Sequence, residues 1–205
     1  MSLKVDVWSD ISCPWCFVGT RRLQQAFDGQ DVEVTFHPFM LRPDASAAGE
    51  NVHEMLRTKY GREPAQMFAP VHDAAKITGI PLDLNQQPLM FNTAAAHTLL
   101  RHAKSKGTQV ALADALFNAY FLQARNIADR NVLEELAVQH GFRVGEAASL
   151  LAAAEIELTR KQARDAGTKG IRGVPFFVFN GKLAVSGAQT VQVLKAAAEQ
   201  ARNAG

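Results

Sequence analysis

Two cysteines, Cys13 and Cys16, are the residues best suited to chemistry, and they are the only cysteines in the chain. A thiolate attacks a disulfide, whereas a neutral thiol does not, and an ordinary cysteine is only roughly 3% thiolate at pH 7. The start of a helix favours the thiolate through its dipole and its free N–H groups. The pair therefore predicts thiol–disulfide exchange, in which Cys13 attacks and the more buried Cys16 resolves the mixed disulfide.

A metal site is the first alternative for this pair. Zinc needs three or four protein ligands, and no second cysteine pair is present. His97 and His102 are five residues apart, which misses the helical spacing that would place both on one face. A structural disulfide is also disfavoured, because closing so short a loop removes little chain entropy. We expect no metal, and we interpret the histidines, including His37 and His140, as solvated or packed residues.

The residues around the cysteines have more than one reading. Pro14 suits the first helical turn, where its missing N–H costs nothing. Trp15 either covers the disulfide and offers an apolar surface to unfolded polypeptide, or packs in the core; both remain open. Asp10 lies three residues before Cys13. A turn or capping role is favoured for Asp10 over a role in moving protons for Cys16.

The pattern along the chain predicts a strand–helix–strand unit, a helical block, and a closing strand–strand–helix unit. Expected strands are 3–9, 32–36, 174–179 and 183–186, and expected helices are 16–27, most of 50–168, and 190–201. The cysteines fall at the first strand-to-helix junction. Asn180-Gly181 predicts a type I′ hairpin turn. Asn131 with Glu134 resembles a capping box at the start of a helix.

Pro175 stands directly before an apolar hairpin, downstream of the cysteine pair. A proline is tolerated at the first position of a strand. Here we favour a cis Val174–Pro175 bond that sets a loop beside the cysteines, although only about 5% of X-Pro bonds are cis in general. Such a loop would leave the Val174 backbone free to pair with an extended substrate segment.

Composition places limits on partners and location. The chain has 205 residues, is 47% hydrophobic and 20% charged, and carries a net charge of +2. These values are ordinary for a globular protein and indicate neither a nucleic-acid nor a membrane surface. No apolar run approaches the roughly 20 residues that span a bilayer, and the first residues lack a signal-peptide pattern. We therefore expect a cytoplasmic protein, where cysteine pairs are usually catalytic, redox-sensing or metal-binding.

Taken together, these motifs resemble a known family. The run from Cys13 to Gly19 after a strand, with 173–176 near the end, is similar to the DsbA-like branch of the thioredoxin superfamily. Further matches are 92–93 with 96–97, and 185–189. The FrnE-like group fits best; it shares its fold with 2-hydroxychromene-2-carboxylate isomerases and kappa-class glutathione transferases.

The resemblance implies an α/β thioredoxin fold with an inserted all-helical domain. Residues 1–45 and 169–205 would form the discontinuous thioredoxin-fold domain, and 46–168 the insertion. Cys13 and Cys16 would be catalytic, and the substrate would contact Pro14, Trp15, Val174 and Pro175. No cofactor is implied beyond the redox-active cysteine pair. Expected partners are a protein or peptide disulfide and a reductant, either glutathione as co-substrate or a thioredoxin system, and a homodimer stays open.

Two other functions remain as alternatives. The first is a glutathione-dependent isomerase or transferase on the same fold. Those enzymes typically carry a serine at the position of Cys13, and the kappa class carries a Gly-Ser-Asp-like turn where this chain has Gly187-Ala188-Gln189. A neutral amide cannot pair with an ammonium group as a carboxylate does, so both differences favour dithiol chemistry. The second is a redox-sensing or polypeptide-binding module without turnover.

Overall fold

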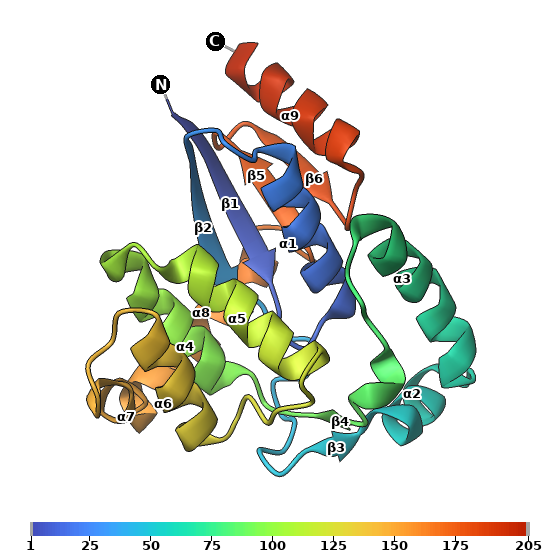
Figure 1. Ribbon diagram of the computed structural model, residues 1–205, viewed down its shortest axis with the longest axis vertical. Coiled ribbons are helices and arrows are strands. Elements are labelled where there is room, and N and C mark those ends of the chain that lie inside the picture. Colours follow the sequence, from blue (N-terminus) through green and yellow to red (C-terminus); the bar gives the residue numbers. More distant parts are fainter. Residues whose placement is uncertain (1, 204–205) are drawn as a thin grey trace.

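A four-stranded mixed sheet forms the upper half of the molecule in the computed structural model, which describes residues 2–203 (Figure 1). Its strand order is β2-β1-β5-β6. β1 runs parallel to β2, whereas β5 is antiparallel to both β1 and β6. The strands are β1 (Leu3–Ser9), β2 (Val32–Pro38), β5 (Phe176–Phe179) and β6 (Leu183–Ser186).

All four predicted strands are confirmed, with small shifts at their ends. β5 begins at Phe176, two residues later than expected, so the Val174–Pro175 pair lies outside the ladder. The turn between β5 and β6 has positive φ at Asn180 (50°) and Gly181 (67°), as the predicted hairpin requires. β1 is central and heavily buried, so its C-terminal end delivers the cysteine loop into the interior.

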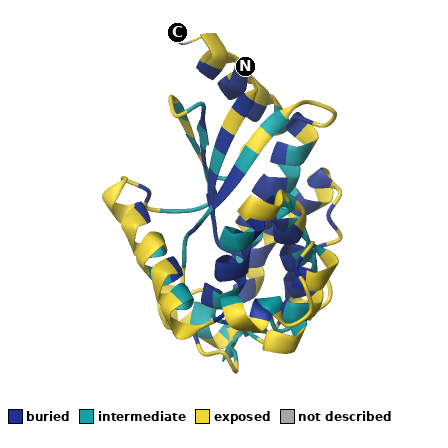
Figure 2. Ribbon diagram, turned by 90° about the vertical axis from the view of Figure 1, so that its left-hand side faces the viewer, coloured by how far each residue is buried: buried dark blue, intermediate teal, exposed yellow. Residues whose placement is uncertain are grey.

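Helices cover the sheet and fill the lower half of the molecule. α1 packs beside α9 and α3, while α4 and α8 contact each other and the edge strand β2. Figure 2 shows dark blue, buried segments on the sheet and the helices beside it, with yellow segments on the outer turns. The helices are α1 (Pro14–Ala26), α2 (Val52–Tyr60), α3 (Pro64–Thr78), α4 (Ala94–Ala103), α5 (Gln109–Phe121), α6 (Arg130–Gln139), α7 (Glu146–Leu150), α8 (Ala153–Thr168) and α9 (Val191–Asn203).

The segment between β2 and β5 differs from the sequence prediction in two details. It contains a short antiparallel ladder, β3 (Glu50–Asn51) with β4 (Leu89–Met90), which was missed because two-residue strands carry no periodic pattern. The predicted capping box at Asn131 is wrong. Asp129 is the N-cap of α6, because its carboxylate accepts the Asn131 N–H at 2.8 Å.

Side chains attach the helical block to the sheet. The buried Gln109 side chain, at the start of α5, bonds both the N–H and the carbonyl of Phe36 at 2.9 and 3.1 Å. Phe36 lies on the edge strand β2, so Gln109 satisfies backbone groups that a further strand would otherwise pair. The Phe17 ring of α1 stacks on Phe117 and Phe121 of α5. These contacts fix α5 beside the cysteine loop, while the domain boundaries at 46 and 168 stay a prediction.

In the described part of the chain, no helix combines the length and the apolar character that crossing a bilayer requires.

Candidate active site at the start of the first helix

Cys13 is the N-cap residue of α1, with an extended backbone (φ −92°, ψ 113°). α1 therefore begins at Pro14, two residues earlier than predicted, with proline at its first position. No side chain caps this first turn, and the turn contains no acidic residue. Cys13 thus stands at the N-cap position, where a side-chain oxygen usually accepts a backbone N–H, and a helix N-terminus in general favours negative charge.

Both cysteines are free thiols, and their surroundings differ. Cys13 is 4% exposed and Cys16 is fully buried. Burial raises the pKa of the Cys16 thiol well above its ordinary value, and the neighbouring Cys13 raises that pKa further. The Ser9 hydroxyl and the Asp10 N–H act in the opposite direction without offsetting burial. Cys16 is therefore a neutral thiol at pH 7. It is also the more buried of the two cysteines, as the sequence predicted.

The loop around Pro175 packs against the cysteines, as predicted. The Val174–Pro175 bond is cis. The Cys13 thiol donates to the Val174 carbonyl, with 3.9 Å between Sγ and O. Close packing depends on Gly19 of α1, because a Cβ there would come within 2.9 Å of Pro175 Cγ. The Gly187 N–H also donates to the Pro175 carbonyl at 2.8 Å, which anchors the loop to the turn after β6.

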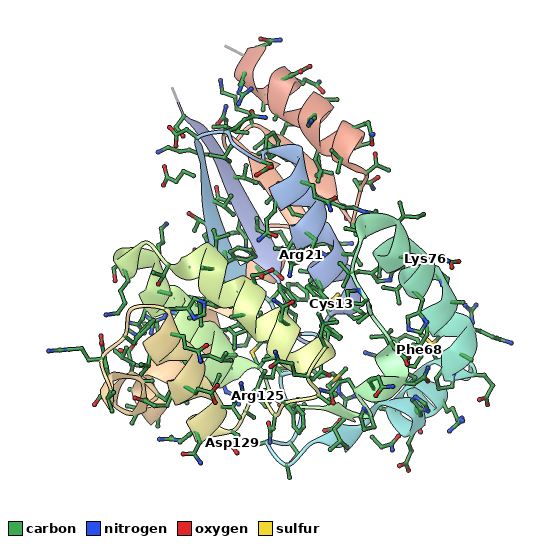
Figure 3. The ribbon with its side chains drawn as sticks, viewed as in Figure 1. Cys13, Arg21, Phe68, Lys76, Arg125 and Asp129 are labelled. Carbon is green, nitrogen blue, oxygen red and sulfur yellow. The ribbon has the colours of Figure 1, made fainter. Side chains whose placement is uncertain are left out.

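An apolar cleft of about 230 Å³ opens above Cys13. Figure 3 shows Cys13 at the lower end of α1, near the middle of the molecule, with Phe68 on α3 to one side. Trp15 is 36% exposed at this cleft, which favours its covering role over core packing. The opposite walls come mainly from α2, α3 and the segment after α3. They include the apolar side chains of Met55, Leu56, Tyr60, Met67, Phe68, Leu84 and Met90.

The same cleft carries two cations, Arg42 and Lys59. Arg42 is held by Glu50, with 2.6 Å between Nη2 and Oε2, and Lys59 lies 5.3 Å from the ring centre of Tyr60. Methionine side chains adapt to differently shaped apolar groups, and cations at a rim attract acidic ones. The cleft is therefore suited to an apolar segment with a nearby negative charge.

Asp10 holds the cysteine loop in place. Its buried carboxylate accepts the Leu41 N–H at 2.8 Å and the Ser12 N–H at 3.3 Å. Burial by itself would raise the pKa of Asp10, but His97 and the hydrogen bonds reverse this, so the pKa lies below its ordinary value. Asp10 is therefore charged at neutral pH. This supports the turn-forming role favoured from the sequence and argues against Asp10 itself as a proton acceptor for Cys16.

His97 is a residue that sequence reasoning did not place at the site. It is 3% exposed, and its Nε2 lies 3.5 Å from Asp10 Oδ1. The two are 87 residues apart, so spacing gave no signal; only the resemblance at 96–97 marked this position. Two further histidines fit ordinary packing: His37 pairs with Asp6 and stacks on Trp8, while the His140 ring bonds the Leu136 carbonyl.

Within residues 2–203, no three His, Cys, Asp or Glu side chains come together as a metal site.

Comparisons with known proteins agree with this fold. A probable DsbA oxidoreductase from Streptomyces coelicolor is 35% identical, with 99% of this chain and 91% of that chain covered, at a TM-score of 0.88. A 2-hydroxychromene-2-carboxylate isomerase is 18% identical, with 96% of this chain and 95% of that chain covered, at a TM-score of 0.77. The cytosolic disulfide reductase DsbM from Pseudomonas aeruginosa is 21% identical, with 98% of this chain and 96% of that chain covered, at a TM-score of 0.67. That structure was solved with GSH.

These likenesses, together with the four-stranded sheet and its helical insertion, confirm the predicted thioredoxin fold of the DsbA type. The sequence profile of the DSBA-like thioredoxin domain matches residues 4–199, nearly the whole chain. The chain therefore belongs to the DSBA-like thioredoxin domain family.

Proposed function

We propose that this protein is a thiol–disulfide oxidoreductase in which Cys13 attacks and Cys16 resolves. One observation carries the proposal: Cys13 is the N-cap residue of α1, at the base of an open cleft and beside the Val174 carbonyl, with the Cys16 thiol fully buried in the first turn of the same helix. The helix end favours negative charge on the first sulfur, and burial keeps the second neutral until it is needed. The two sulfurs are thus suited to different steps.

The reaction conserves atoms and electrons. The Cys13 thiolate attacks one sulfur of a substrate disulfide, forms a mixed disulfide, and releases the other substrate sulfur as a thiolate. Cys16 then loses its proton and attacks the Cys13 sulfur. The Cys13–Cys16 disulfide forms, the second substrate thiolate leaves, and two electrons have passed to the substrate. A reductant returns two electrons to close the cycle, and the reverse sequence would oxidise a dithiol.

The cleft supports a protein or peptide disulfide whose cysteine lies beside apolar residues. Pro14 and Trp15 line the near wall, and the Val174–Pro175 loop offers a backbone carbonyl at the attacking sulfur. We further propose glutathione or a dithiol protein of the thioredoxin type as the reductant, and the cytoplasm as the compartment. The structural neighbour named a cytosolic disulfide reductase, solved with GSH, is consistent with both.

Glutathione transfer or isomerisation on the same fold is the main alternative. The turn after β6 offers no acid for a ligand's ammonium group. The Ala188 carbonyl already accepts the Arg22 guanidinium at 2.7 Å, and the Gln189 amide donates to Ser186 at 2.9 Å. These bonds, with cysteine at position 13, favour dithiol exchange.

Reduction of insulin with glutathione as reductant tests the proposal. Wild type should catalyse it, whereas Cys13→Ser should lose at least about 100-fold, because no thiolate remains at the helix start. Cys16→Ser should form mixed disulfides and turn over slowly, since nothing inside the protein resolves them.

Cysteine-free Cys13→Ser/Cys16→Ser protein is the matched control for non-enzymatic reduction. Full activity of Cys13→Ser would refute the proposal. Turnover of a small aromatic substrate by Cys16→Ser with bound glutathione would support the isomerase alternative. Partner binding that changes with oxidation state, without any catalytic cycling, would instead identify a redox-sensing module.

A further inference from the structure

A second hollow lies across the cysteine loop from the apolar cleft. This polar cavity, about 280 Å³, is bounded by β1, β2, α4 and α8. Ser9 and Ile11 line it, whereas Ser12 and Cys13 line the cleft, and the two hollows share no lining residue. The loop that carries the cysteines therefore separates the apolar cleft, which we call the front of the site, from the polar cavity, which we call its back.

Two buried polar atoms at this cavity have no hydrogen-bond partner: Ser9 Oγ and His97 Nε2. Both residues line the cavity, and they are 1% and 3% exposed. Unpaired buried polar atoms are costly and usually mark a functional group or a water site. The Ser9 hydroxyl is also one of the groups that act on the Cys16 thiol. Ser9 thus lines the polar cavity and also influences the resolving thiol.

The resolving step needs a route by which the Cys16 proton can leave. Cys16 is fully buried and must lose its proton before it attacks. A substrate bonded to Cys13 and held in the apolar cleft would shield that side of the loop from solvent. The polar cavity on the other side of the loop would then be the route left for the proton.

We propose that the polar cavity is the proton-exchange site of the resolving step, and that His97 takes up the Cys16 proton through the Ser9 hydroxyl. This inference rests on the proposed function. The Cys16 S–H proton passes to Ser9, whose own proton passes to His97 directly or through cavity water. The Cys16 thiolate then forms the Cys13–Cys16 bond, the Cys13–substrate bond breaks, and the substrate leaves as a thiolate. His97 returns its proton to solvent through the cavity.

Asp10 is a positioning residue in this scheme. Its carboxylate faces His97 Nε2 at 3.5 Å while two backbone N–H groups hold it in place. A negative charge at that distance stabilises the imidazolium that forms when His97 takes up the proton. The other charged and titratable groups around the cavity come from three elements. They are His37 on β2, Arg101 and Lys104 at the end of α4, and Asp165 and Lys169 at the end of α8.

Single-turnover kinetics with oxidised glutathione separate the two steps. Mixed-disulfide formation and Cys13–Cys16 closure are followed by acid quench and mass spectrometry from pH 5.5 to 9.5. In His97→Gln, closure at pH 7 should slow by about 100-fold, as for loss of a general base, while the attack step keeps its rate. The difference in closure rate between His97→Gln and wild type should shrink towards pH 9.5, where hydroxide takes the proton. Imidazole added to His97→Ala should restore closure, since the cavity has room for it.

His102→Gln is the matched control, because His102 lies on the same helix and pairs with Glu155 away from the cysteines. Ser9→Ala removes only the hydroxyl oxygen and should slow closure at least tenfold. This second variant tests the inference even if His97→Gln does not fold. If both His97→Gln and Ser9→Ala close at the wild-type rate with the wild-type pH profile, the inference is overturned while the proposed function stands. Failure of the wild-type protein to form any mixed disulfide would overturn the proposed function instead.

Discussion

At the scale of single residues, the two cysteine side chains occupy different environments. Cys13 is the N-cap residue of α1 at the base of a cleft, whereas Cys16 lies in the interior without contact with solvent. Desolvation disfavours the charged form of a thiol, and an N-terminal helix dipole favours it. The proposed order of attack and resolution rests on this difference. The buried thiol should also leave a signature in the stability of the reduced protein.

The pKa of Cys16 is raised in the folded state, whereas the unfolded thiol ionises near pH 9. A raised pKa stabilises the fold below the unfolded value, and this contribution is lost as pH rises. We expect the unfolding free energy of the reduced wild type to fall faster above pH 9 than that of Cys16→Ser. The excess should approach about 1.4 kcal/mol per pH unit. Urea unfolding with reductant at pH 7.5, 9 and 10 measures it, and parallel pH dependence in both proteins would contradict it.

At the scale of elements, the site depends on how closely α1 approaches the loop before β5. Gly19 permits this approach, because a Cβ would meet Pro175 Cγ at 2.9 Å and Phe177 Cζ at 3.2 Å. Arg22, one turn further along α1, bonds the Ala74 and Ala188 carbonyls and Thr78 Oγ1, which ties α1 to α3 and to the turn after β6. α1 is thus fixed at its start and its middle.

Gly19→Ala tests this packing. The added methyl group should force the Pro175 loop outward and cost about 1–3 kcal/mol, more than the gain of about 1 kcal/mol from alanine's helix propensity. Gly167→Ala in α8 is the matched control, since nothing lies within 4 Å of its added Cβ, and it should be neutral or stabilising. Thermal unfolding of both variants measures the difference. Equal stability gains in the two proteins would show that α1 does not pack tightly against the Pro175 loop.

At the scale of the whole molecule, residues far apart in sequence meet at the cysteine loop. Much of this was predictable locally: the cysteine motif, the strand before it, and the hairpin after Pro175 all have short-range patterns. The cis bond at Pro175 followed from its place before an apolar hairpin. Physical rules about short segments were sufficient for these elements.

The back of the site was not predictable from those rules. His97 contacts Asp10 only because α4 packs against β2, and helical spacing within α4 gives no indication of it. The apolar cleft likewise needs Trp15 from α1 and Met55 from α2 to line the same space. The short β3–β4 ladder escaped prediction for a similar reason, because its pairing joins residues about 40 positions apart. Long-range packing carries this information.

The most direct test of the account identifies which sulfur the substrate meets first. Reduced wild type, mixed with an equimolar peptide disulfide and quenched with acid within milliseconds, is digested and mapped by mass spectrometry. The account predicts that the earliest adduct lies on Cys13, and that it decays into a Cys13–Cys16 disulfide. A first adduct on Cys16, or adducts on both sulfurs at equal rates, would contradict it.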